Sequence, residues 1–367
     1  MKETEKDQAL KERLKTAINR ILKDMDLDAL LVTDPYNMRY LSGFCGGEGV
    51  LYISPDNQIL ITDSRYTEAA EQESGFTVME CNREHRTTDI LKAVIQREGV
   101  RRLGYEDETM RCKAFREYQE KLDPIGTWTP LGMALTRLRQ VKTEEELQCL
   151  RQAEAIGDTA FDRILKMIRP GMTELDIQAE LEYQMMKCGA SGTSFDTIVA
   201  SGLHSSMPHA IPTDKKVEHG DFITMDFGCR YKGYCSDMTR TIVLGKANEK
   251  QKEIYQLVLK ANQVTESFLH PGMICREVDK IARDMITDGG YGEYFGHGLG
   301  HSVGLEIHES PACNTRDATV LVPNMIMTIE PGIYLPGFGG VRIEDMVVIT
   351  ENGYENLSHS AKELIEL

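Results

Sequence analysis

Short apolar segments separated by polar turns dominate the first third of the chain. An amphipathic stretch from Ile90 to Arg97 follows them, and this alternation of strand-like and helix-like periodicity is typical of an α/β domain. Pro55-Asp56-Asn57 predicts a hairpin turn, because Pro fixes φ and Asp and Asn tolerate turn conformations. We predict an α/β domain over residues 1–136. Its expected strands are Ala29–Val32, Leu51–Ile53, Ile59–Ile61 and Phe76–Val78.

A helix is predicted to open a second domain, at residues 137–367. Thr143 to Glu146 form a capping box, in which the Thr oxygen and the Glu carboxylate each satisfy a free backbone N–H at the helix start. Apolar residues recur at helical spacing as far as Ile168. Arg169-Pro170-Gly171 predicts the end of this helix, because Pro and Gly terminate helices.

The second domain contains a weak internal repeat. Three features recur in the same order roughly a hundred residues apart, which indicates a duplication, whereas a single Pro-Gly-Met would be an ordinary turn. The first is Pro-Gly-Met followed by a helical stretch, at residues 170–189 and 271–290. The second is an acid two residues before Gly, at residues 226–228 and 330–332, and the third is a further acid, at residues 237 and 344.

The two acids of the first copy are expected to lie side by side. Ile223–Phe227 and Thr239–Val243 are apolar and β-branched, so they predict two strands that pair across a loop at Gly228–Gly233. This hairpin would bring Asp226 next to Asp237. Because side chains alternate along a strand, Asp237 and the threonines at 239 and 241 share one face.

The second copy predicts the same arrangement. Met325–Glu330 is expected to form a strand, Gly332–Gly340 a loop and Val341–Glu344 the return strand. Glu330 and Glu344 would then meet, as the acids of the first copy do.

Four carboxylates in one place need a compensating charge, because buried ions of like charge repel and are costly to desolvate. Two divalent cations would neutralise them, with His301 as a neutral ligand. Oxygen ligands with one nitrogen favour manganese and permit cobalt, zinc or iron. A single acid would more often be a solvated charge or a salt bridge, but the full set predicts a two-metal hydrolytic centre of Asp226, Asp237, His301, Glu330 and Glu344.

His297, His301 and His308 lie in one glycine-containing segment between the two pairs of acids. A lone histidine would more often be an ordinary surface or core residue. Three together beside an acid cluster suggest that one binds metal while others face substrate. Apolar residues alternate between His301 and His308, so these two need not share an environment.

Composition narrows the class of partner and the compartment. The formal net charge is −16, which argues against nucleic acid, since a phosphate backbone requires a basic face. No apolar run reaches about 18 residues, and residues 1–20 lack a secretory apolar core, so we expect a soluble cytoplasmic protein without a membrane partner. The nine cysteines show no Cys-x-x-Cys pair and are expected to be reduced. Cys229 and Cys235, near the first acids, are expected to be buried thiols and not metal ligands.

These motifs resemble those of the creatinase/prolidase/aminopeptidase P family of metallopeptidases, whose pita-bread fold is shared with methionine aminopeptidase. The first domain is similar to that family at residues 37–44 and 62–66. The resemblance implies an α+β chain, in which a smaller creatinase-like α/β domain precedes a pita-bread catalytic domain with a pseudo-twofold duplication. The matching segments of the second domain are residues 226–228, 237–241, 296–304, 330–332 and 342–345.

The resemblance also implies roles for individual residues. The five predicted ligands would hold two metals, with Asp237 and Glu344 bridging them, and a metal-bridging hydroxide would attack the peptide bond. Arg342 is expected to hold Glu344 in place, and Thr239 to hold Asp237. The catalytic residues would be Glu330, which moves the proton of the attacking water, and His308, His297 and His209, which contact substrate and the developing oxyanion.

The substrate implied by the resemblance is a peptide with proline at its second position, and the assembly is a homodimer. We favour an Xaa-Pro aminopeptidase, while an Xaa-Pro dipeptidase shares every catalytic residue and stays open. A non-catalytic pita-bread binding protein would have lost metal ligands, and none is lost here. Methionine aminopeptidase is disfavoured because that enzyme can work without the leading domain. The proline pocket itself is not visible in the sequence.

Overall fold

The structure is a computed structural model that describes residues 5–367, with side chains from residue 12 onward. The chain forms two compact units, Met1–Arg139 and Gln140–Leu367. The domain limits expected from the sequence, 1–136 and 137–367, remain a prediction. In the part of the chain described, no helix has the length and apolar character needed to cross a membrane. Residues 1–20 were expected to lack a secretory apolar core. Residues 1–4 of that segment lie outside the described residues.

The first unit is built on a six-stranded mixed sheet with the order β4-β3-β2-β1-β5-β6. The central strands β1, β2 and β3 pair antiparallel, whereas β4, β5 and β6 each join a parallel neighbour. The predicted turn at Pro55–Asn57 joins β2 to β3, and the Ser54 N–H donates to the Asn57 carbonyl at 2.8 Å. The strands are β1 Ala29–Val32, β2 Val50–Ile53, β3 Gln58–Asp63, β4 Thr77–Cys81, β5 Arg102–Tyr105 and β6 Thr127–Pro130.

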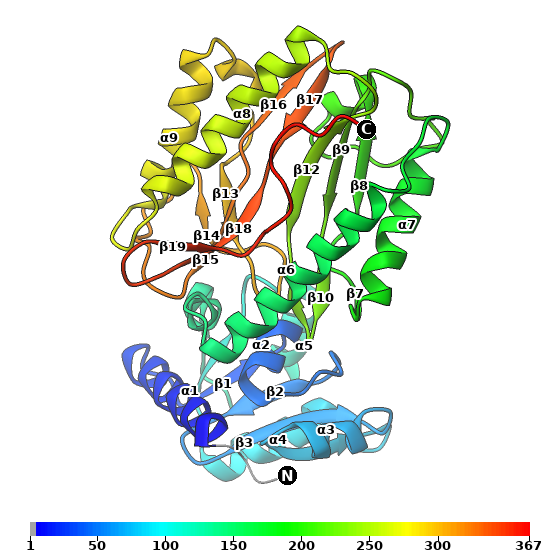
Figure 1. The fold of residues 1–367 in the computed structure, drawn as a ribbon. Helices are drawn as coiled ribbons and strands as arrows, with labels where there is room; N and C mark the ends of the chain where they lie inside the picture. Colours follow the sequence, from blue (N-terminus) through cyan, green and yellow to red (C-terminus); the bar gives the residue numbers. More distant parts are fainter. Residues whose placement is uncertain (1–4) are drawn as a thin grey trace. The chain divides into compact units, whose positions relative to one another are not determined.

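Helices supply apolar side chains to both faces of this sheet, and Figure 1 labels α1 and α4, which contribute to the two cores. Leu30 packs in one core with Ile18 of α1, whereas its neighbour Leu31 packs in the other core with Leu91 of α4. Successive residues of a strand point to opposite faces, so the fully apolar β1 serves both cores. The helices are α1 Glu5–Asp24, α2 Pro35–Ser42, α3 Thr67–Glu73, α4 Thr87–Glu98, α5 Cys112–Lys121, η1 Gly132–Ala134 and η2 Thr136–Arg139.

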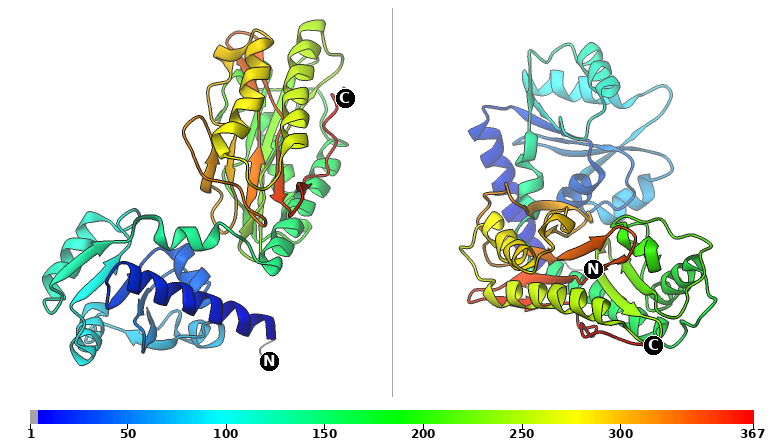
Figure 2. Two further views of the ribbon diagram at one scale, coloured as in Figure 1. Left: turned by 90° about the vertical axis from the view of Figure 1, so that its left-hand side faces the viewer. Right: turned by 90° about the horizontal axis from the view of Figure 1, so that it is seen from above.

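The second unit contains two copies of one motif, in which a packed pair of helices precedes strands and a small hairpin (Figures 1 and 2). The first copy comprises α6 Glu144–Ile164, α7 Glu174–Lys187, β7 Gly192–Thr193, β8 Ile198–Ser201, η3 Gly202–Ser206, β9 Phe222–Phe227, β10 Cys229–Tyr231, β11 Tyr234–Cys235 and β12 Met238–Val243. The second comprises α8 Glu249–Phe268, α9 Cys275–Asp288, η4 Gly292–Tyr294, β13 Gly300–Ser302, β14 Glu309–Cys313, β15 Ile326–Ile329, β16 Gly332–Leu335, β17 Gly339–Arg342 and β18 Asp345–Ile349, and β19 Tyr354–Asn356 follows. Each helix pair packs on the strands of its own copy.

Helix α6 begins as predicted. The Thr143 hydroxyl accepts from the Glu146 N–H at 3.2 Å, and the Glu146 carboxylate accepts from the Thr143 N–H at 2.6 Å. The helix ends at Ile164, earlier than the predicted Ile168. Beyond it the chain continues in tighter turns, in which the Lys166 and Met167 N–H groups donate to the carbonyls three residues before them.

The hairpin of the first copy is longer than predicted. Strands β9 and β12 pair antiparallel as expected, with Asp226 opposite Thr239. The predicted loop at Gly228–Gly233 is wrong, because it contains β10 and the turn into β11. Lys232 and Gly233 have φ values of 49° and 86°, and such paired positive values suit a two-residue hairpin turn.

The predicted strand pairing of the second copy is also wrong. The expected loop at Gly332–Gly340 forms the hairpin of β16 and β17, and Val341 and Arg342 pair within that hairpin. The partner of β15 is β18, with Ile329 opposite Asp345. Both copies therefore place a small hairpin between their two acids. In the second copy the strands outside this hairpin, β15 and β18, pair with each other. Residue type alone did not reveal that pairing.

Candidate metal centre

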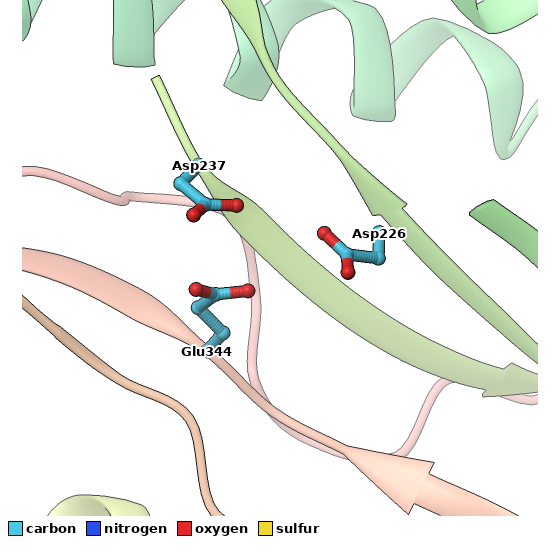
Figure 3. A group of neighbouring side chains, drawn as sticks. All are labelled: Asp226, Asp237 and Glu344. Atoms are coloured by element: carbon cyan, nitrogen blue, oxygen red, sulfur yellow. The ribbon is translucent and has the colours of Figure 1, made fainter. Parts of the chain in front are cut away.

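The four acids occupy equivalent places in the two copies. Asp226 lies near the end of β9 and Asp237 immediately precedes β12, while Glu330 immediately follows β15 and Glu344 immediately precedes β18. Carboxylate oxygens of Asp226, Asp237 and Glu344 lie within 4.8 Å of one another. Figure 3 shows these three carboxylates turned towards a common space. Three of the four acids therefore converge as predicted, although the strand pairing of the second copy differs from the prediction.

His301 completes the group from β13. Its Nε2 lies 3.5 Å from Asp237 Oδ2 and 3.5 Å from Glu330 Oε1. Its Nδ1 lies 3.0 Å from the Ser302 carbonyl, which can only accept, so Nδ1 carries the hydrogen. The lone pair of Nε2 is thereby left facing the acids, which is the tautomer that a metal ligand requires.

A glycine permits the close contact between β13 and β15. A Cβ atom at Gly300 would lie 2.0 Å from the Thr328 carbonyl oxygen. The Thr328 hydroxyl accepts from the His301 N–H at 3.0 Å and donates to Glu330 at 3.1 Å. Thr328 thus fixes two members of the group together, a role that its place in an apolar segment did not signal.

The acid cluster is electrostatically unfavourable without cations. Burial, together with the charges of Glu344 and Asp226, raises the pKa of Asp237 well above its usual range. Burial also raises the pKa of Glu344, to which Glu330 and Asp226 add, and the pKa of Glu330 to about 8. Such a group either shares protons or coordinates cations.

The donors present suit divalent metal ions. Asp226 Oδ2 accepts from Arg342, whereas the buried Asp226 Oδ1 makes no hydrogen bond within the described chain. An orphaned buried carboxylate oxygen is costly unless a ligand satisfies it. Burial lowers the pKa of His301 to about 4, so its ring is neutral and available as a ligand. Carboxylates and one neutral imidazole form a donor set for metals such as manganese.

Two neighbouring residues support the acids across the two copies. Thr239 donates to Glu344 Oε2 at 2.6 Å, and Arg342 donates from Nη2 to Asp226 Oδ2 at 2.6 Å. The prediction that Thr239 holds Asp237 and that Arg342 holds Glu344 is therefore wrong in its pairing. Strand order brings each supporting side chain opposite the other copy, so the bonds cross between the halves.

A cavity of about 860 Å³ opens onto the acids. His209 and His308 line it, both exposed, together with His297 and His301. The rings of His301 and His308 are 4.6 Å apart and nearly perpendicular, at 71°. The expectation that these two need not share an environment is thus replaced by direct contact, because β13 and β14 pair antiparallel with Ser302 opposite Glu309, which brings His308 back beside His301.

His297 is held on both sides of its ring. Nδ1 lies 2.7 Å from the Gly298 carbonyl and Nε2 lies 3.0 Å from the Tyr334 hydroxyl. The Tyr334 hydroxyl also accepts from Arg342 Nη1 at 2.7 Å, so its own hydrogen points to His297. Burial lowers the pKa of His297 to about 4 and raises that of Tyr334 to about 12, which keeps both neutral. Tyr334 was not anticipated, since it lies in the segment expected to be a loop.

Cys229 and Cys235 are free, buried thiols outside the acid group. Burial raises the pKa of Cys229 to about 12 and that of Cys235 to about 11. Both stay protonated at neutral pH, whereas a metal would bind the thiolate.

Comparisons with known proteins give the family of the chain. Residues 148–351 match the family described as "Metallopeptidase family M24", and residues 13–141 match the "Creatinase/Prolidase N-terminal domain". The fold and the acid site therefore define a metallopeptidase. More specifically, the chain belongs to metallopeptidase family M24, with the pita-bread fold in its second unit.

Relatives cover nearly the whole chain. An Xaa-Pro dipeptidase of Pyrococcus furiosus is 39% identical over 97% of this chain and 100% of its own length. The solved structure of an Xaa-Pro dipeptidase from Bacillus anthracis is 42% identical, covers 98% of this chain and 99% of that one, and has a TM-score of 0.93. That of an X-Pro aminopeptidase from Thermotoga maritima is 38% identical, covers 95% and 100%, and has a TM-score of 0.88.

Proposed function

We propose that this protein is a metal-dependent Xaa-Pro dipeptidase, which hydrolyses dipeptides with proline at the second position. The observation that carries the proposal is the convergence of four carboxylates and His301 on one cavity in a chain of family M24. The sequence alone favoured an aminopeptidase. Full-length relatives named as Xaa-Pro dipeptidases support the dipeptidase instead.

The metal site is assigned to five residues, and manganese is the first choice, with cobalt, zinc or iron as alternatives. Two divalent ions held there would lower the pKa of a water molecule and polarise the peptide carbonyl. The five residues are Asp226, Asp237, His301, Glu330 and Glu344.

The other side chains act on substrate and protons. Glu330 faces the cavity and takes the proton of the attacking water, while Thr328 holds its carboxylate. His308 and His209 are exposed in the cavity, so their ring N–H groups can donate to the oxygen on which charge develops. His297 lines the cavity and has both ring nitrogens engaged, so its proposed role is to form the wall with its ring fixed by Tyr334, and not to donate to the oxyanion as the sequence suggested.

A positively charged side chain in the cavity supports the proposal that the substrate is a dipeptide. The arginines that line it are Arg316 and Arg342, and Arg342 is committed to Asp226 and Tyr334. The exposed Arg316 guanidinium makes no hydrogen bond or ion pair with any described residue. A free guanidinium matches the carboxylate that a dipeptide carries directly after its proline.

An Xaa-Pro aminopeptidase is the second candidate, favoured by the likeness to the Thermotoga maritima enzyme. It differs in accepting peptides that continue beyond proline. We also propose a homodimer, which light scattering would test.

The deciding experiment incubates the protein with Mn²⁺ and Ala-Pro, Ala-Pro-Ala or Ala-Ala, with and without a chelator. The proposal expects Mn²⁺-dependent cleavage of Ala-Pro well above that of Ala-Pro-Ala. Equal or faster cleavage of Ala-Pro-Ala would favour the aminopeptidase. Cleavage of Ala-Ala alone would reject both.

A further inference from the structure

His209 depends on its loop for its position. The exposed His209 ring makes no hydrogen bond with the described residues, and residues 207–215 form neither helix nor strand. The same loop supplies Pro208, Ala210 and Ile211 to the cavity wall. The position of His209 must therefore be set by contacts that other residues make within the segment 202–212, hereafter the His209 loop, and at its two ends.

One buried carboxylate joins both ends of this loop. Glu174 is the first residue of α7, and its side chain is fully buried. Its Oε1 accepts from the Ser201 N–H at 2.7 Å and from the Ser201 hydroxyl at 2.8 Å. Its Oε2 accepts from the Thr213 N–H at 3.0 Å and from the Thr213 hydroxyl at 2.8 Å. Ser201 directly precedes the His209 loop and Thr213 directly follows it.

A third residue of the loop region completes the contacts of Glu174. His204 Nδ1 lies 3.0 Å and 2.9 Å from the two carboxylate oxygens. Burial by itself raises the pKa of Glu174, but hydrogen bonds from His204, Thr213 and Ser201 outweigh it, and the pKa lies below its usual range. The carboxylate is thus an ionised group whose capacity to accept hydrogen bonds is filled.

The far side of the loop rests on the second copy. Arg342 Nη1 donates to the Pro208 carbonyl at 3.3 Å, and the Gly340 N–H donates to the Ser205 hydroxyl at 2.9 Å. Arg342 also holds Asp226. The His209 loop is therefore held between Glu174 and the strand that supports the acid group.

We propose that Glu174 is a positioning residue, which acts on the reaction through His209 by clamping the two ends of the His209 loop. This role rests on the proposed function, because it assumes that His209 contacts substrate. Glu174 does not line the cavity, so it has no direct route to the substrate. A shift of about 1 Å in a positioned group can lower a rate by about 100-fold.

The test is a double-mutant cycle of Glu174→Gln with His209→Ala, measured as kcat/KM on Ala-Pro with Mn²⁺. The amide NH₂ of Gln would face the donor groups of either Ser201 or Thr213, which it cannot accept from. One end of the clamp is then lost with little change in side-chain volume. We expect Glu174→Gln to lower kcat/KM by about 10- to 100-fold in the wild type and by less than about twofold in the His209→Ala background. Equal factors in both backgrounds would overturn the proposal. Glu180→Gln, on the same helix and bonded to Gln184, is the matched control.

Amide hydrogen exchange gives a second measurement that does not need activity. The Ser201 and Thr213 amides donate directly to Glu174, so their exchange should accelerate in Glu174→Gln and not in Glu180→Gln. Unchanged exchange would overturn the clamp itself. A wild type inactive on every Xaa-Pro peptide would instead remove the proposed function, and exchange would still decide whether Glu174 holds the loop.

Discussion

Thr239 of the first copy donates a hydrogen bond of 2.6 Å to Glu344 of the second copy. Arg342 of the second copy in turn donates to Asp226 of the first, also at 2.6 Å, and its Nε donates to the Thr239 hydroxyl at 3.0 Å. Each copy therefore holds an acid of the other in place. Asp226 and Glu344 are thus each oriented by the other half, which joins the duplicated motif into one site.

Removal of the Thr239 hydroxyl should weaken the metal site. Thr239→Val keeps the shape of the side chain but leaves Glu344 without its donor. We expect a loss of about 10- to 100-fold in metal affinity or activity, as is typical for residues that orient ligands. The measurement is a Mn²⁺ titration of activity. Thr239→Ser keeps a hydroxyl and is the control, and equal effects of the two variants would contradict the explanation.

Substitution of Glu330 tests the assigned proton acceptor. Glu330→Gln keeps the size of the side chain and removes its basicity, so kcat should fall by about 10²–10⁴-fold or more, the range of general acid–base catalysis. Circular dichroism should show a retained fold. The exposed Glu351→Gln serves as the control. Turnover within about twofold of wild type would remove Glu330 from this role.

Metal removal should lower stability as well as activity. Divalent ions relieve the repulsion among buried acids and bind only the folded chain, so they should stabilise it by about 2.7 kcal/mol at a hundred times Kd. A thermal melt with Mn²⁺ should therefore show a higher Tm than one with chelator. His301→Ala should show a smaller difference. Identical melts of the wild type under both conditions would argue against a metal site here.

The Glu174 clamp predicts a pH-dependent stability difference. Hydrogen bonds place the pKa of Glu174 below its usual range, so its contribution is present above the unfolded pKa and is lost as pH falls through the folded pKa. At pH 7, Glu174→Gln should lower the free energy of unfolding by about 1–3 kcal/mol, because buried donors lose their acceptor.

This deficit relative to wild type should shrink as the pH falls below about 4.3, the ordinary glutamate pKa. Urea denaturation at neutral and acidic pH measures it, with Glu180→Gln as the reference. A deficit that stays constant with pH would show that the carboxylate charge contributes nothing.

Arg316 should discriminate between substrates by their C-terminal charge. Arg316→Gln is expected to raise KM for Ala-Pro by about tenfold or more, since a charge-assisted hydrogen bond contributes about 1.5–3 kcal/mol. Ala-Pro amide lacks the carboxylate, so its KM should change little. Comparable changes for both substrates would show that Arg316 does not meet the carboxylate. Arg163→Gln, outside the cavity, is the control.

Local features of the second unit were predictable from the sequence. The capping box at Thr143, the strands that carry Asp226 and follow Asp237, and the helices after the two Pro-Gly-Met segments all form. Each depends on residue type and short spacing. The internal duplication was also detectable, because both copies keep the same order of helix and acid.

Errors arose where residue type does not show which segments pair. Both small hairpins were taken for loops, and Glu344 was placed at the end of a return strand that pairs elsewhere. Thr328 and Tyr334 were missed for a related reason. The Thr328 hydroxyl acts because β13 brings His301 to it, and the Tyr334 hydroxyl acts because the hairpin of β16 and β17 carries it to His297.

The sequence by itself determined which residues could ligate a metal, and the family of metallopeptidases to which the chain belongs. Acids and a histidine are recognisable one by one, and their order along the chain is independent of packing. Only the tertiary structure decided how these residues are held: Glu344 by Thr239, Asp226 by Arg342, and the ends of the His209 loop by Glu174. These contacts join segments far apart in the chain, and those between the copies form because the folded chain places β12 beside the segment of Arg342 and Glu344, where the Glu344 N–H donates to the Thr239 carbonyl at 3.1 Å.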